Sequence, residues 1–144
     1  MIRRMAVGDL REVAGLEESC FSEPWSYHLL ASGIHSPYDV YYVFEQAGAI
    51  IGYANLRLLA GEAEIQRIAV RPAYQRFGAG RKLMDVMVTC AMKSGAAVIR
   101  LEVRKSNTAA RRLYESYDFV TEAIRKEYYH NPTEDALMMC RPLP

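Results

Sequence analysis

The spacing of apolar and polar positions predicts strands in the first half of the chain. Residues 1–6 are expected to form a short strand. Apolar runs over Val40–Phe44 and Ile50–Leu59 have the length of strands, and Gln46-Ala47-Gly48 between them predicts a hairpin turn. A further strand follows and ends before Pro72, because proline has no N–H group to donate to a β-ladder.

Two helices are expected near the N-terminus. Apolar residues at helical spacing from Leu10 to Cys20 predict the first. Asp9 is its expected N-cap, and Glu12 three residues later completes the pattern of a capping box. Ser26 is the expected N-cap of a second, short helix that Gly33 ends.

The second half of the chain continues the mixture of strands and helices. Val98–Val103 is predicted to be a strand, and Asn107 is expected to cap the helix that follows. Phe119–Tyr129 and Ala136–Cys140 predict a closing hairpin. In the predicted strand Val98–Val103, one face carries Ile99, Leu101 and Val103, and the other carries Arg100, Glu102 and the following Arg104. This order predicts an α/β (α+β) fold over residues 1–144 as a single domain, with a mixed, mostly antiparallel sheet between helices.

The stretch from Ile65 to Met84 predicts a strand, a turn and the start of the longest helix, which ends near Ser94-Gly95. A glycine-bearing turn that opens a helix leaves backbone N–H groups free for an anion, and Gly78 and Gly80 allow a ligand to approach closely. The stretch has no Asp or Glu, and its basic residues are Arg67, Arg71, Arg76, Arg81 and Lys82. A phosphate or pyrophosphate is the simplest ligand, although neither the P-loop nor the dinucleotide fingerprint is complete.

Composition narrows the class of protein. The chain has 144 residues, of which 51% are hydrophobic and 24% are charged, and no apolar run has the length of a membrane span. Met1-Ile2-Arg3-Arg4 precedes no apolar segment, so no signal peptide is expected. Neither the cysteines nor the histidines have the spacing of metal ligands, so we expect reduced thiols, no metal and a cytoplasmic location.

The net charge is only +1, but the charges are unevenly distributed. Between Arg11 and Arg57 all charged residues are acidic: Glu12, Glu17, Glu18, Glu23, Asp39 and Glu45. Two interpretations are open. The acidic flank and the basic loop are two solvated surfaces, or they attract a cationic substrate and an anionic cofactor to one site.

Several motifs together carry a resemblance to a known family. The segment Gln75-Arg76-Phe77-Gly78-Ala79-Gly80, after Ile68-Ala69-Val70 and a proline, fits Gln/Arg-x-x-Gly-x-Gly/Ala and resembles the acetyl-CoA loop of the GNAT N-acetyltransferases. Asn107-x-x-Ala110-x-x-Leu113-Tyr114, followed by Phe119, is similar to the second motif of that family. Phe21-x-x-Pro24-Trp25-Ser26 and Tyr128-Tyr129 with Glu134-Asp135-Ala136 resemble the RimI-like ribosomal-protein-alanine N-acetyltransferases. One departure is Asp118, where the family has glycine at the end of a helix.

The resemblance implies a role for individual residues. Glu102 would accept the proton of the amine, with Glu64 as the reserve candidate, and Tyr114 would protonate the CoA sulfur. The Val70 N–H would polarise the thioester carbonyl. Each of these roles has an open alternative. Glu102 would instead be a strand carboxylate that pairs with Arg100 or Arg104, and Tyr114 would be a core tyrosine with a satisfied hydroxyl. The cofactor-binding positions implied are Ile68, Ala69, Val70, Gln75, Arg76, Phe77, Gly78, Ala79, Gly80, Arg81 and Asn107. The substrate-binding positions implied are Trp25, Tyr128 and Tyr129.

The function implied by the resemblance is acetylation of the N-terminal amine of a ribosomal protein, with acetyl-CoA as co-substrate. The expected partner is the N-terminal peptide of that protein, bound by a monomer without contact to nucleic acid or membrane. Two alternatives remain open at this point. One is a GNAT enzyme for a small amine such as an antibiotic or a polyamine, and the other is a CoA-binding regulatory module without turnover.

Overall fold

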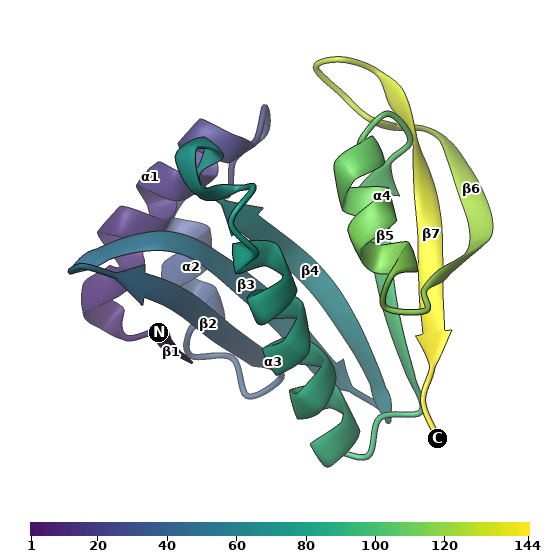
Figure 1. The fold of residues 1–144 in the computed structure, drawn as a ribbon, viewed down its shortest axis with the longest axis horizontal. Helices are drawn as coiled ribbons and strands as arrows, with labels where there is room; N and C mark the ends of the chain where they lie inside the picture. Colours follow the sequence, from purple (N-terminus) through teal and green to yellow (C-terminus); the bar gives the residue numbers. More distant parts are fainter.

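The central element of the protein is one seven-stranded sheet, seen in a computed structural model that describes residues 1–144 (Figure 1). Its strands are β1 (Ile2–Arg4), β2 (Asp39–Gln46), β3 (Ala49–Leu59), β4 (Glu62–Val70), β5 (Val98–Arg104), β6 (Val120–Tyr129) and β7 (Glu134–Pro142). They lie in the order β1-β2-β3-β4-β5-β7-β6. Only the central pair, β4 and β5, is parallel. The predicted mixed, mostly antiparallel sheet is therefore confirmed.

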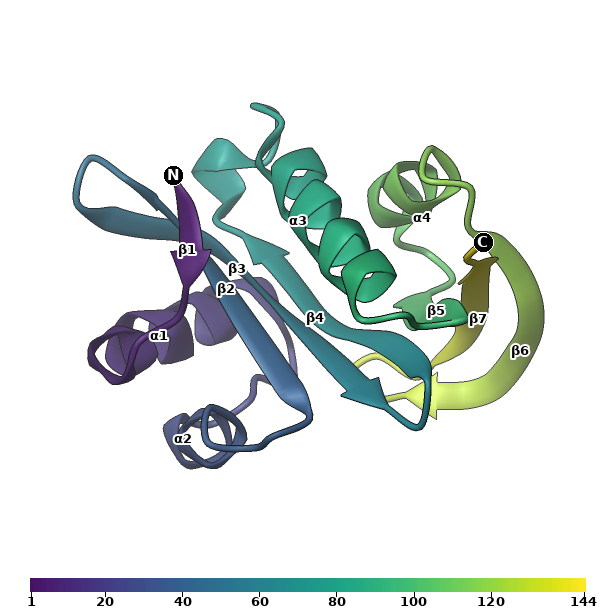
Figure 2. The same ribbon diagram turned by 90° about the horizontal axis from the view of Figure 1, so that it is seen from below.

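Helices cover both faces of this sheet, as predicted (Figure 2). The helices α1 (Leu10–Cys20) and α2 (Tyr27–Gly33) lie on one face, and α3 (Ala79–Lys93) and α4 (Thr108–Glu115) lie on the other. Short 3-10 turns at Val7–Asp9 and Pro72–Tyr74 precede α1 and α3. None of the helices is long and apolar enough to cross a membrane.

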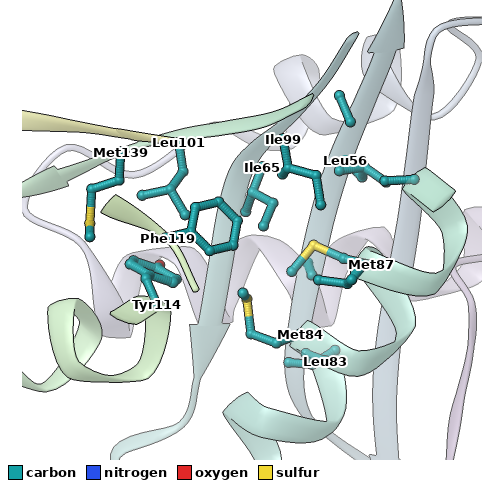
Figure 3. Close-up of a cluster of buried hydrophobic side chains, with 14 of the residues drawn as sticks. Leu56, Ile65, Leu83, Met84, Met87, Ile99, Leu101, Tyr114, Phe119 and Met139 are labelled. Carbon is teal, nitrogen blue, oxygen red and sulfur yellow. The ribbon is translucent and has the colours of Figure 1, made fainter. Parts of the chain in front are cut away.

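Each face of the sheet has its own hydrophobic core. On the α3 side, Met84 and Met87 of the helix pack with Ile65, Leu101 and Phe119 (Figure 3). On the α1 side, the buried side chains are those of Leu10, Val13, Leu16 and Leu30, packed on Val43, Ile50 and Tyr53 of the sheet. The alternation predicted for Val98–Val103 is confirmed, because only its apolar residues are buried.

The two central strands diverge after a short contact. Their parallel ladder joins only Ala63–Ile65 to Ile99–Leu101, although β4 continues to Val70 and β5 continues to Arg104. Beyond this point β5 pairs only with β7, and the facing edges of β4 and β5 form no ladder hydrogen bonds with each other. The divergence leaves an opening in the middle of the sheet.

A β-bulge in β4 determines which residues face this opening. The register with β3 pairs Leu56 with Ile65 but Asn55 with Arg67, so Gln66 is the extra residue. Before the bulge, Ala63 and Ile65 face α3. After it, the alternation is inverted, so Arg67 and Ala69 face α1 instead.

The predicted helix caps are partly correct. Ser26 accepts a hydrogen bond from the Leu29 N–H (3.1 Å), and Asn107 accepts one from the Ala110 N–H (3.2 Å), so both caps are confirmed. The capping box predicted at Asp9 is wrong. Its carboxylate instead accepts hydrogen bonds from the Ala6 N–H (2.7 Å) and the Arg3 guanidinium, because the 3-10 turn brings these donors to it.

Candidate active site

A cavity of about 1160 Å³ lies where β4 and β5 diverge. Its lining comes from both halves of the molecule. One side is formed by the α1–α2 connection and by β4 from Glu64 to Val70, and the other by β5, α4 and the end of β6. The loop before α3 and the first turn of that helix complete the wall.

The turn that opens α3 presents unused hydrogen-bond donors. The backbone N–H groups without an acceptor in the protein are those of Arg76, Gly78, Ala79, Gly80 and Arg81. The first helical bond is donated by Lys82 to the Gly78 carbonyl (3.2 Å). Gly78 has a φ of 78°, in the left-handed region that favours glycine. Free donors at the N-terminus of a helix form a site for an anion.

Only some of the basic side chains of the stretch Ile65–Met84 lie near this turn and line the cavity. Arg76 and Arg81 line the cavity, but Arg71 donates to the Ile50 carbonyl (2.9 Å). Lys82 lies over the Phe44 ring, 5.6 Å from its centroid. Arg67 lines the cavity but is bound to a carboxylate on the opposite side from α3. Of the basic residues of the stretch, Arg76 and Arg81, the two that the resemblance assigned to the cofactor, are thus the ones that line the cavity near the turn.

Val70 lies at the end of β4, where the two strands are apart. The Arg71 N–H donates to the Ile51 carbonyl (2.8 Å), so by the alternation of an antiparallel ladder the Val70 N–H points away from β3 and toward the opening. The Val70 carbonyl accepts hydrogen bonds from Gln75 Nε2 (3.0 Å) and Cys20 Sγ (3.5 Å). These contacts hold the Val70–Arg71 peptide, which follows that N–H, at the edge of the cavity.

Glu102 projects into the cavity from β5 with no ion-pair partner. The alternative of a carboxylate paired with its neighbours on the strand is not what the structure shows. Arg100 binds Glu62 and Glu122, and Arg104 lies 3.5 Å from Glu134. Glu102 is therefore available to a ligand. Glu64 also lines the cavity, but its Oε1 accepts a hydrogen bond from Gln66 Nε2 (3.1 Å).

Tyr114 is a buried residue of α4 that borders the same cavity. Its ring packs against Phe119, with centroids 6.1 Å apart (Figure 3). Its hydroxyl makes no hydrogen bond with the protein. The hydroxyl oxygen is nevertheless accessible, because it is absent from the polar atoms that are both sealed from solvent and unpartnered. Burial, with a smaller effect of Tyr129, raises the pKa of Tyr114 above that of an ordinary tyrosine. The phenol therefore keeps its proton and can donate it.

Three aromatic side chains predicted to shape a peptide groove also line the cavity: Trp25, Tyr128 and Tyr129. The two tyrosine rings are in edge-to-face contact, with centroids 5.2 Å apart. The nearby Glu102 carboxylate is the main cause that raises the pKa of Tyr128, and burial is the next. Burial, with a smaller effect of Glu102, raises the pKa of Tyr129 to about 12. Both hydroxyls therefore stay neutral around Glu102 at ordinary pH.

Two of the predicted positions do not line the cavity. Phe77 is 78% exposed and points to solvent, and Ala79 packs its side chain into the core. The other predicted positions, Asn107 included, do line it. The sequence analysis missed Arg104 and Arg112, which also line the cavity. Their positions on the polar face of β5 and on α4 beside the recognised motif were the available signals.

The acidic flank is mostly engaged in internal contacts. Glu12 accepts a hydrogen bond from the Ile50 N–H (2.9 Å), and Glu17 is fully buried. Asp39 pairs with Arg57 (3.2 Å), and Glu45 pairs with Arg3 (3.3 Å). Of the acidic residues in this flank, only Glu23 lines the cavity. The second interpretation, in which the acidic flank attracts a cationic substrate to the site, is therefore supported at the cavity by Glu23 alone.

Comparison with known proteins agrees with this geometry. The family model described as acetyltransferase (GNAT) family matches residues 10–119, which include the loop before α3, Glu102 and Tyr114. The chain belongs to the GNAT acetyltransferase family. Proteins of this family use acetyl-CoA. No group of His, Cys, Asp and Glu side chains in this GNAT protein is arranged to hold a metal ion.

Individual relatives of this GNAT chain are enzymes that acetylate N-terminal amines. It is 36% identical over 146 residues to the [ribosomal protein bS18]-alanine N-acetyltransferase of Escherichia coli, with 99% of this chain and 97% of the relative covered. It is 34% identical over 139 residues to the N-alpha-acetyltransferase RimI of Mycobacterium tuberculosis, covering 92% and 86%. The crystal structure of the Escherichia coli ribosomal-protein-S18-alanine N-acetyltransferase superposes with a TM-score of 0.91 at 35% identity, covering 99% and 92%.

Proposed function

We propose that this protein transfers the acetyl group of acetyl-CoA to the N-terminal α-amine of a small-subunit ribosomal protein, with alanine as the first residue. The observation that carries this proposal is that one cavity contains the anion-binding turn, an unpaired Glu102 and an accessible Tyr114 hydroxyl. The Escherichia coli relative is named as the alanine N-acetyltransferase of ribosomal protein bS18, and it matches nearly the whole chain. Such an enzyme would act in the cytoplasm, where ribosomal proteins are made.

Acetyl-CoA would bind along the turn that opens α3. The free N–H groups from Arg76 to Arg81 would donate to its pyrophosphate, and the Arg76 and Arg81 side chains would add positive charge. Gly80 has limited space, since a Cβ there would lie 3.3 Å from Leu113 Cδ2. Asn107, which caps α4 beside the cavity, would contact the same ligand.

The transfer needs three groups from the protein. Glu102 would accept the proton that the attacking amine loses, and Tyr114 would give its proton to the departing CoA thiolate. The Val70 N–H would donate to the oxyanion of the tetrahedral intermediate. The C–N bond forms first and gives this intermediate, and the C–S bond breaks when the intermediate collapses. After turnover Glu102 releases its proton to solvent, and the tyrosine is reprotonated from solvent.

The preference for an α-amine over a lysine side chain follows from the lower pKa of the α-amine. A reference α-amino group has a pKa near ~7.7–8.0, against ~10.4 for lysine, so at neutral pH it is neutral far more often. A carboxylate base such as Glu102 is then sufficient. Trp25, Tyr128 and Tyr129 would form the walls for the first residues of the peptide.

Mass spectrometry of the ribosomal proteins tests the proposal. Ribosomal proteins from cells that lack the enzyme, incubated with purified protein and acetyl-CoA, should gain one acetyl group on the N-terminal residue of a small-subunit protein. A peptide with a blocked N-terminus and free lysines should gain none. Full-rate acetylation of that blocked peptide would contradict an N-terminal enzyme.

The two other functions considered from the sequence make different predictions. A small-amine enzyme predicts that a polyamine outcompetes every peptide. A regulatory module predicts acetyl-CoA binding without turnover of any amine. The unpaired Glu102 and the accessible Tyr114 hydroxyl in one cavity argue for turnover, and the relatives argue for a protein substrate.

A further inference from the structure

Glu17 is a fully buried carboxylate that the proposed chemistry does not use. It lies near the C-terminal end of α1 and accepts three hydrogen bonds. The donors are the Arg67 guanidinium (3.0 Å), the Trp25 N–H (2.7 Å) and the Tyr53 hydroxyl. A buried charge is tolerated only when such partners satisfy it, so this cluster is a built feature of the fold.

The Arg67 guanidinium contacts Glu17 of α1 and the segment that follows this helix. Besides Glu17, its Nη2 donates to the Glu23 carbonyl (3.1 Å). Its guanidinium lies over the ring of Phe21, 4.0 Å from the centroid, and over the ring of Trp25, at 4.7 Å. A planar guanidinium makes these hydrogen-bonding and stacking contacts at the same time, which an ammonium group does not.

That segment is the α1–α2 connection, residues 21–26, which has no helix or strand. Ser22, Glu23 and Trp25 donate no hydrogen bond to a backbone carbonyl. The connection is held by side chains instead. Glu17 binds the Trp25 N–H, Arg67 binds the Glu23 carbonyl, and Arg104 lies 3.3 Å from Ser22 Oγ across the cavity. Phe21, Ser22, Glu23 and Trp25 of this connection line the cavity.

We propose that Glu17 and Arg67 are positioning residues that hold the α1–α2 connection in place as a preformed wall of the peptide groove. This inference rests on the proposed function, because it assigns the wall to the peptide rather than to acetyl-CoA. A preformed wall lowers the ordering cost of peptide binding. Loss of the pair should therefore weaken peptide binding and leave the anion-binding turn, which it does not contact, unchanged.

The main test combines Glu17→Gln with Arg67→Met. Both charges are removed together, so no buried charge is left unpaired. The KM for an N-terminal alanine peptide should rise about tenfold, whereas kcat and the dissociation constant of acetyl-CoA should stay near the wild-type values. Arg67→Lys, which keeps the charge but loses the stacking fork, should give an intermediate KM. The combination of Asp39→Asn with Arg57→Met, which removes both charges of the Arg57–Asp39 pair outside the cavity, is the matched control and should not change the KM.

A second readout does not depend on turnover. Trp25 is the only tryptophan of the chain, so its fluorescence reports on the α1–α2 connection alone. Acrylamide should quench Trp25 more strongly in the Arg67 variants than in the wild type, and the control with both Asp39→Asn and Arg57→Met should behave as the wild type.

Two results would overturn the inference: unchanged quenching with unchanged peptide KM, or an equal loss of acetyl-CoA binding and peptide binding. A wild-type enzyme that acetylates no peptide would instead overturn the proposed function. The quenching experiment would still decide whether Glu17 and Arg67 hold the connection.

Discussion

Glu102 and Arg104 lie two residues apart on the same face of β5, yet they do not form an ion pair. Arg104 donates to the carbonyls of His130 (2.8 Å) and Pro132 (2.9 Å) and lies 3.5 Å from Glu134. The carbonyl groups of the β6–β7 loop thus bind the Arg104 guanidinium, which would otherwise be placed to neutralise Glu102. This arrangement leaves a free carboxylate beside the Tyr128 and Tyr129 rings, and it makes Glu102 the first residue to test.

Replacement of Glu102 by glutamine keeps the shape of the side chain and removes its basicity. For a peptide with a free N-terminal alanine, kcat/KM should fall about 10²- to 10⁴-fold, the scale of a lost general base. Steady-state kinetics at constant pH measure the effect. Glu64→Gln is the matched control, because Glu64 lines the same cavity and should lose little activity. The reverse ranking would make Glu64 the base.

Tyr114→Phe removes only the hydroxyl and keeps the buried ring. The value of kcat should fall roughly 10²-fold, because the thiolate then leaves without a positioned acid. Acetyl-CoA binding, measured by calorimetry, should change little. Tyr117→Phe is the control, since the Tyr117 hydroxyl binds Asp85 and the Arg81 carbonyl and does not line the cavity. Wild-type turnover in the Tyr114 variant would reduce this residue to a packing role.

Gly78→Asp should weaken acetyl-CoA binding by about tenfold or more, a loss of ~1.4 kcal/mol. The new carboxylate would repel the pyrophosphate at the turn whose N–H groups are free. Gly61→Asp is a close control, because Gly61 has nearly the same left-handed backbone (φ of 77°), an equally open surrounding and no place in the cavity. Equal affinities of the two variants in calorimetry would remove the turn from the cofactor site.

The tyrosines predict a loss of stability in alkaline solution. Burial is the main cause that raises the pKa of Tyr41, Tyr42 and Tyr129 to about 12 in the folded state. An unfolded tyrosine has a pKa near ~10. The stabilisation is therefore fully present below pH ~10 and is lost as the pH rises from ~10 toward 12, because the unfolded state releases protons first. Urea unfolding at several pH values should show this decline, and Tyr41→Phe should make it shallower.

Local sequence patterns were sufficient for much of the fold. Ser26 and Asn107 cap helices because the N-cap interaction joins a side chain to a backbone N–H three residues later. The strand alternation of residues 98–103 depends only on the pleat. Asp118 takes up the left-handed conformation (φ of 68°) expected from its place after the helix motif. In each case the interacting groups are close in the chain.

The sequence by itself thus determined the order of the elements, the fold family and the turn that opens α3. The tertiary structure decided which charges are free and which are paired. Glu17 meets Arg67 across 50 positions, and this contact exists only because the bulge at Gln66 turns Arg67 toward α1. Asp9 was assigned a local cap but binds Arg3, and Glu102 is free because Arg104 is held by the β6–β7 loop. The charge of a side chain is local, but its partner depends on strand register and on packing between segments far apart in the sequence.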